Sequence, residues 1–73
     1  MRVYLKELRE NNEMTQQDVA NVIKVTRQYY QKIESGGRQQ RMEIAFAAKL
    51  ADAFNVSIEH IIEKEREWSE ASV

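Results

Sequence analysis

The sequence predicts an all-α fold of five short helices in a single domain. Its 73 residues include no proline and only two glycines, which are adjacent at Gly36-Gly37, so little interrupts helix formation. In several segments the apolar residues recur three and four positions apart, which is the helical period. A chain of this length has room for one domain. We expect that domain to span residues 1–68, followed by a frayed tail at 69–73.

The first two helices are predicted at residues 2–11 and 16–23. In the first helix the apolar residues are Val3, Tyr4, Leu5 and Leu8, and we expect Arg9 to lie outside with the other charges. Thr15 precedes the second helix and is a good N-cap, because its hydroxyl can accept a hydrogen bond from a first-turn N–H. The expected buried face of the second helix consists of Val19, Ala20, Val22 and Ile23.

The third predicted helix, residues 27–35, is mostly polar. The short joint Lys24-Val25 separates it from the preceding helix, and Thr26 is its predicted N-cap. Only Tyr30 and Ile33 form an inward-facing stripe. Because this stripe is narrow and the polar face is wide, we expect the helix to project from the body of the protein.

Two more helices complete the predicted fold, at about residues 42–54 and from residue 58 to about 68. Gly36-Gly37 is expected to end the third helix with a positive φ. Asn55 is expected at the end of the fourth helix, and Ser57 is the predicted cap of the fifth. The fourth helix is the most apolar segment, and its predicted buried stripe contains Ile44, Ala47, Ala48, Ala51 and Phe54.

The segment 15–36 therefore has the arrangement of a helix-turn-helix unit. Two short helices, each opened by a threonine cap, are joined by about three residues, and the small Ala20 lets their backbones approach. The net charge of the chain is −1, but residues 24–41 carry five basic residues and one acidic residue. A projecting polar helix in a basic segment can enter a DNA major groove, which is about 12 Å wide.

The chain resembles a known family at this point. The runs LKELR at 5–9, MTQQDVA at 14–20 and VTRQYYQKIESG at 25–36, continued by LADAFNVS at 50–57, are similar to the Cro/cI-type (lambda-repressor-like, or XRE) helix-turn-helix family. The resemblance covers about residues 3–62. It implies a compact five-helix DNA-binding domain with the helix-turn-helix at helices 2 and 3. It also implies a bacterial or phage transcription regulator, often a homodimer on palindromic double-stranded DNA.

The resemblance also implies the residues that contact DNA. Arg27, Gln28 and Lys32 match base-reading positions, and arginine suits guanine while glutamine suits adenine. Lys24 departs from the family, which commonly has glycine in the turn, and the loop after Gly36 is about two residues longer. The expected phosphate contacts are Gln16, Gln17, Thr26, Tyr29, Arg38 and Arg41.

Two kinds of partner remain open besides DNA. We expect the protein to be a repressor and to form a homodimer. The candidate residues of the dimer interface lie on the last predicted helix. The alternative is a protein-interaction module, such as an antitoxin or a regulatory adaptor, that acts through a regulatory protein partner. The polar third helix favours DNA over this alternative. The candidate dimer residues are Ile58, Ile61, Ile62 and Trp68.

The composition argues against catalysis, metal binding and membrane insertion. The chain has no cysteine, and its single histidine, His60, has no second ligand at a suitable spacing. There is no glycine-rich phosphate loop and no nucleophile–base set, so we expect no enzyme, no catalytic residues and no cofactor. No apolar run approaches the length of a membrane span. We therefore expect a soluble, cytoplasmic protein.

Overall fold

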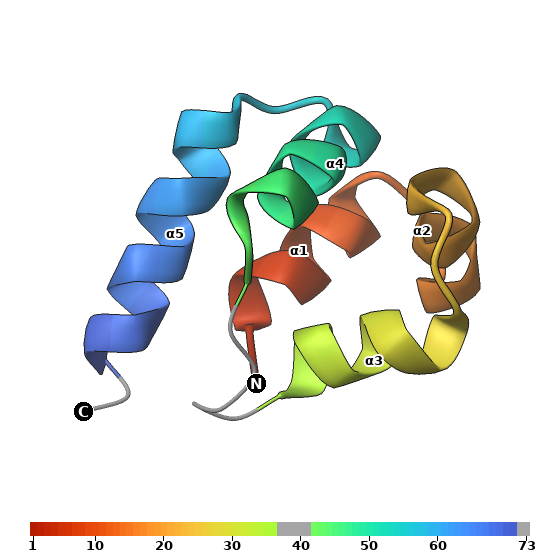
Figure 1. Ribbon diagram of the computed structural model, residues 1–73, viewed down its shortest axis with the longest axis horizontal. Helices are drawn as coiled ribbons and strands as arrows, with labels where there is room; N and C mark the ends of the chain where they lie inside the picture. The colour runs from red at the N-terminus through yellow and green to blue at the C-terminus, as the bar shows by residue number, and fades with distance from the viewer. Residues whose placement is uncertain (37–41, 72–73) are drawn as a thin grey trace.

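Five α-helices make up most of residues 1–36 and 42–71, the part of the chain that the computed structural model describes (Figure 1). This confirms the predicted all-α fold. The helices α2 and α3 have the bounds that the sequence predicts, and α1 begins one residue later than expected. The helices are α1 (Val3–Asn11), α2 (Gln16–Ile23), α3 (Arg27–Ser35), α4 (Ile44–Phe54) and α5 (Ile58–Ala71).

Threonine caps fix the start of both helices of the helix-turn-helix unit, as predicted. The Thr15 hydroxyl accepts a hydrogen bond from the Asp18 N–H at 3.1 Å, and the Thr15 N–H donates to the Asp18 carboxylate at 2.8 Å. This reciprocal pair is a capping box, and its hydrogen bonds lower the pKa of Asp18. The Thr26 hydroxyl accepts from the Tyr29 N–H at 3.1 Å. Because α3 begins at Arg27, the side chain of this residue lies in its first turn.

The turn between α2 and α3 depends on a left-handed lysine. Lys24 has φ 62° and ψ 46°, and its N–H bonds to the carbonyl of Ala20. The N–H of Val25 bonds to the same carbonyl at 3.0 Å, so the chain reverses directly after α2. Gly36 does not supply the positive φ that was expected from Gly36-Gly37, since this residue is extended at φ −63° and ψ 156°. Gly37 lies outside the described residues.

The core is formed by side chains from all five helices, and α4 is its centre. Figure 1 shows α4 between α5 on one side and α2 on the other. Ala47, Leu50, Ala51 and Phe54 are buried along one face of α4. The helices α1, α2, α3 and α5 contribute Leu5, Val19, Ala20, Ile23, Tyr30, Ile33 and Ile61.

The structure corrects three details of the predicted helices. Val22 and Ile44 were expected in buried faces but are 55% and 71% exposed. Each of them lines a hollow in the surface, so no neighbouring side chain covers it fully. The N–H of His60 bonds to the Ser57 hydroxyl at 3.1 Å, which confirms the predicted cap of α5. That helix continues to Ala71, into the segment where we expected a frayed tail.

Replacing Lys24 by glycine is expected to stabilise the fold. A left-handed non-glycine residue costs about 1–2 kcal/mol, of which the greater freedom of glycine in the unfolded chain offsets a part. We expect Lys24→Gly to raise the free energy of unfolding by about 0.5–1 kcal/mol in urea titrations. Lys49→Gly is the matched control, because glycine inside α4 should lower it by about 1 kcal/mol. A loss of stability in Lys24→Gly would contradict the left-handed turn.

Candidate nucleic-acid interface

The outer face of α3 presents four polar side chains to solvent. Arg27 and Gln28 lie in its first turn, and Gln31 and Lys32 follow one turn later; all four are exposed. The side chains of Arg27, Gln28 and Lys32 make no hydrogen bond or ion pair with any residue of the described ranges. The predicted base-reading residues therefore share one open surface.

A buried carboxylate holds the inner face of α3. The side chain of Glu34 is 1% exposed and accepts hydrogen bonds from three helices. Arg9 of α1 binds it through Nε at 2.9 Å and through Nη2 at 3.2 Å. Gln16 of α2 donates from Nε2 at 2.8 Å, and Tyr30 of α3 donates from its hydroxyl at 2.9 Å. These four residues, which we call the Glu34 network, fix α3 against α1 and α2.

The hydrogen bonds of the Glu34 network keep the Glu34 carboxyl group ionised. Burial alone would raise the pKa of Glu34, but the hydrogen bonds from Arg9, Gln16 and Tyr30 outweigh it and hold the pKa below its ordinary value. Burial and the neighbouring carboxylate raise the pKa of Tyr30, so its hydroxyl stays protonated and donates. The hydrogen bond with Glu34 raises the pKa of Arg9. The network is thus a fully bonded ion pair at neutral pH.

The Glu34 network was not predicted from the sequence, and Arg9 was expected on the outside of α1. The Arg9 side chain is instead largely covered, and its Nη1 also donates to the carbonyl of Met14 at 3.1 Å. A signal was present, since Tyr30, Ile33 and Glu34 have the spacing of one helix face. A buried acid on that face requires a basic partner from another helix.

The predicted phosphate contacts lie beside α3, each with a different local role. The Gln16 amide belongs to the Glu34 network, and Gln17 donates to the Asn21 side chain at 2.9 Å. Thr26 caps α3. The ring of Tyr29 meets Phe46 edge-on, with centroids 5.7 Å apart, and remains partly exposed. The two other predicted contacts, Arg38 and Arg41, lie outside the described residues.

The candidate dimer residues divide into two groups. Ile61 is fully buried in the core of its own chain, so its place in a dimer interface was wrongly predicted. The side chain of Trp68 makes a contact within its own chain, because its Nε1 donates to the carbonyl of Met1 at 2.9 Å. Ile58 is half-buried against the core, and Ile62 is 45% exposed. Of the four, Ile62 is the most available to a partner.

A second buried ion pair ties the start of the chain to α5 and to the end of α3. The guanidinium of Arg2 binds both carboxylate oxygens of Glu65, at 2.8 and 2.9 Å, and lies over the Trp68 ring at 4.3 Å. Tyr4 donates its hydroxyl to the same carboxylate at 2.6 Å. The backbone N–H of Arg2 donates to the carbonyl of Glu34 at 2.7 Å. Burial raises the pKa of Glu65, but the hydrogen bonds that its carboxylate accepts from Arg2 and Tyr4 lower it. The net result is a pKa below the ordinary value.

Within residues 1–36 and 42–71, no group of three or more histidine, cysteine, aspartate or glutamate side chains could hold a metal ion. None of the helices in these ranges has both the length and the apolar character that crossing a bilayer requires.

The fold and the exposed polar face of α3 define the class of a helix-turn-helix protein. Comparison with known families agrees, because the model described as "Helix-turn-helix" matches residues 5–61, which is most of the chain. The chain belongs to this family of Cro/cI-like, XRE-type DNA-binding transcription regulators. No curated protein and no solved structure matches the chain.

Removing Arg9 should destabilise the fold strongly. Arg9→Ala would leave the Glu34 carboxylate buried without its charged partner, which costs about 3–5 kcal/mol. The matched control is Arg66→Ala, which breaks the exposed Arg66–Glu63 pair at 2.9 Å and should cost less than about 1 kcal/mol. Chemical denaturation of both variants measures the difference. Equal losses in the two variants would show that Glu34 is not buried with Arg9.

Stability should fall in acid because of Glu34 and Glu65. Both carboxyls have a folded-state pKa below the ordinary value of 4.5, so the unfolded chain binds these protons more readily. Their contribution is therefore complete above about pH 4.5 and is lost as the pH falls through the lower folded-state pKa. Denaturation between pH 7 and pH 3 should show a shallower acid slope in Glu65→Gln than in the wild type. Identical slopes would rule out this contribution of Glu65.

Proposed function

We propose that this chain is a sequence-specific repressor that inserts α3, its recognition helix, into the DNA major groove. The observation that carries the proposal is the outer face of α3. There Arg27, Gln28 and Lys32 are exposed and without partners among the described residues, while the Glu34 network holds the opposite face. A recognition helix needs both properties, because its side chains must reach the bases from a fixed backbone.

Each base-reading residue has a role suited to its chemistry. The fork of Arg27 can donate two hydrogen bonds to O6 and N7 of guanine, and the amide of Gln28 can pair with N6 and N7 of adenine. Both side chains belong to the first turn of α3, which is the part that reaches base edges in helix-turn-helix proteins. Lys32 lies one turn further along and would contact a neighbouring base.

The phosphate contacts would fix the register of α3 on the duplex. The Gln16 amide nitrogen donates one hydrogen to Glu34 and keeps a second that can bind a phosphate oxygen. The exposed Gln17 amide, the Thr26 hydroxyl and the Tyr29 hydroxyl are further donors along the same helices. The charges of Arg38 and Arg41 complete the proposed set.

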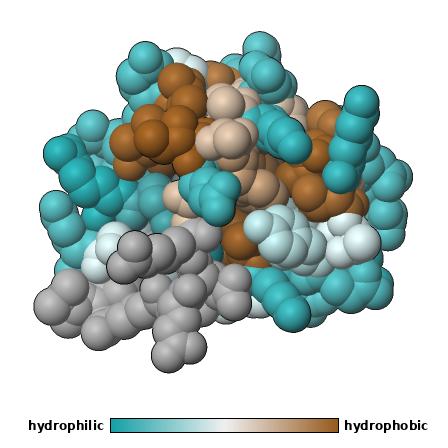
Figure 2. Space-filling model, in the orientation of Figure 1, coloured by the Kyte–Doolittle hydropathy of each residue, from teal (hydrophilic) through white to brown (hydrophobic). Residues whose placement is uncertain are grey.

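We further propose that the protein acts as a homodimer on a palindromic operator. An apolar surface suited to this role lies on α4 and α5, where Figure 2 shows hydrophobic side chains gathered on one face. Met42, Ile44 and Ile62 line a shallow hollow there of about 170 Å³. A two-fold dimer through this surface would present two recognition helices about 34 Å apart, which matches one turn of DNA. The bound dimer would block access to the operator.

Selection from a pool of random duplexes tests the DNA-binding proposal. We expect the wild type to enrich a defined sequence. Because each well-placed bidentate contact contributes about 1–3 kcal/mol of discrimination, Arg27→Ala and Gln28→Ala should each relax the preference at one base pair. Lys64→Ala on α5 is the control and should keep the preference. If no sequence is enriched, or if both α3 variants keep the wild-type preference, the protein does not read DNA through α3.

The same selection tests the dimer and the alternative of a protein-interaction module. A homodimer should enrich a two-fold symmetric sequence with half-sites about 10 base pairs apart. Ile62→Lys should then give a monomer in sedimentation and reduce enrichment to a single half-site. A wild type that stays monomeric and enriches no sequence would favour a protein partner on α4 and α5.

A further inference from the structure

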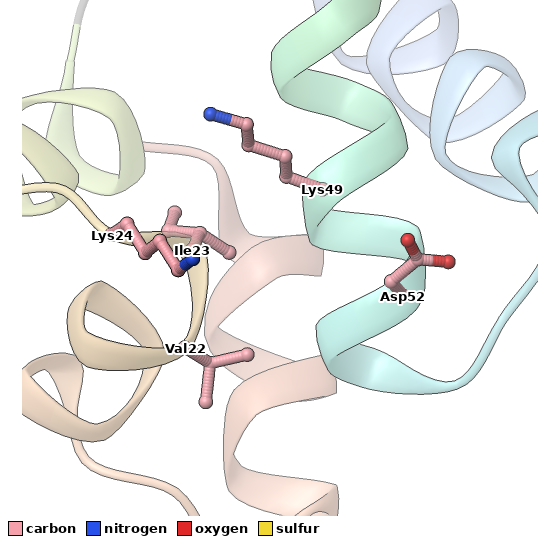
Figure 3. Close-up of a pocket in the computed structure, with 5 residues that line it drawn as sticks. All are labelled: Val22, Ile23, Lys24, Lys49 and Asp52. Carbon is pink, nitrogen blue, oxygen red and sulfur yellow. The ribbon is translucent and has the colours of Figure 1, made fainter.

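A hollow between α2 and α4 contains two lysines that the proposed DNA contacts do not use. It has a volume of about 250 Å³ and lies beside the turn of the helix-turn-helix unit. Figure 3 shows Val22, Ile23 and Lys24 on one side of this hollow, and Lys49 and Asp52 on α4 at the other. We call it the α2–α4 hollow.

Both ammonium groups are available to a ligand. Lys24 and Lys49 are exposed, and neither forms an ion pair with any residue of the described ranges. In Figure 3 the Lys49 side chain extends from α4 toward the side of the turn and α3, away from Asp52. The Asp52 carboxylate therefore lies apart from the Lys49 ammonium, and the positive charge gathers in the part of the hollow nearest the turn.

The α2–α4 hollow is continuous with the flank of α3. Lys49 also lines the adjacent hollow, which includes Tyr29 of α3, Phe46 of α4 and the exposed Glu43. Lys24 stands two residues before the Thr26 cap, where α3 begins. The two lysines thus flank the first turn of α3. Glu43 lines only the adjacent hollow, whereas the α2–α4 hollow is lined by both lysines and by Asp52.

We propose that Lys24 and Lys49 together bind backbone phosphates of the DNA strand that passes along this side of α3. This inference rests on the proposed function, since it requires α3 to enter the major groove. An ammonium on a flexible stem suits a phosphate, which it contacts as a point charge without reading sequence. Two such contacts beside the first turn would fix the end of α3 that carries the base-reading residues.

The backbone at Lys24 supports a role for its side chain. Lysine adopts the left-handed conformation there at a cost that glycine would avoid. The hydrogen bonds of the turn are made by the backbone alone, because the N–H groups of Lys24 and Val25 both bond to the Ala20 carbonyl. The fold therefore does not require the lysine side chain, but a phosphate site does.

Salt titration of DNA binding tests the proposal. The variants are Lys24→Gln, Lys49→Gln and their double variant, and the probes are the duplex enriched by selection and a scrambled duplex of equal length. Each lost phosphate contact should reduce the slope of log affinity against log salt by about 0.9, and the double variant should reduce it by about 1.8. Affinity should fall by the same factor on both duplexes, because phosphate contacts carry no sequence information.

Lys64→Gln is the matched control, because it removes the same charge from a partly exposed position on α5. It should leave the slope within about 0.3 of the wild-type value, since one contact is about 0.9. The proposal is overturned if the Lys24 and Lys49 variants change the slope no more than this control. It is also overturned if their loss of affinity is confined to the selected duplex.

Lys24→Gly separates binding from folding. This variant should unfold at a temperature equal to or above that of the wild type, yet lose DNA affinity and slope as Lys24→Gln does. Wild-type affinity in Lys24→Gly would overturn the role of the side chain. If the wild type binds neither duplex, the proposed function fails and this inference falls with it. If the wild type binds DNA and the lysine variants behave like the Lys64→Gln control, the proposed phosphate site is wrong but the proposed function stands.

Discussion

The buried carboxylate of Glu34 fixes the position of α3 against α1 and α2. It joins three helices through four hydrogen bonds, from Arg9, Gln16 and Tyr30, and its own residue belongs to α3. An apolar contact would also hold α3 but would permit small rotations about its axis. A carboxylate bonded from several directions permits fewer, because each rotation lengthens at least one bond. The exposed side chains of Arg27, Gln28 and Lys32 on the opposite face of α3 are oriented by it.

The ends of the helices were predictable because they depend on local chemistry. Thr15 and Thr26 cap the helices that follow them, and Asn55 takes the left-handed conformation at the end of α4. Packing was less predictable. Periodicity identifies a face of a helix but not how far a neighbour covers it, so Val22 and Ile44 were assigned to the core and are exposed. These two errors arise at the margins of otherwise correct stripes.

In the candidate site, too, local features were easier to predict than contacts between distant residues. The resemblance to the helix-turn-helix family pointed to Arg27, Gln28 and Lys32, and all three are exposed on one local element, α3. It did not reveal the Glu34 network or the α2–α4 hollow, because each joins residues that are distant along the chain. Charged residues are ordinarily assigned to solvent, and the spacing of Glu34 with Tyr30 and Ile33 does not show which basic residue would pair with it. Only the tertiary arrangement provides the carboxylate partners of Arg2 and Arg9.

The contacts of Arg2 affect the order in which the molecule can be completed during synthesis. A ribosome releases the amino end first, and the hydrogen-bond partner of Arg2 on α5 lies 63 positions further along. The helices of the helix-turn-helix unit can form from nearby residues, whereas closure between Arg2 and α5 must wait until α5 has emerged. Such a long connection is also the slowest to close by diffusion. Closure of the Arg2–Glu65 pair thus follows the formation of the local helices.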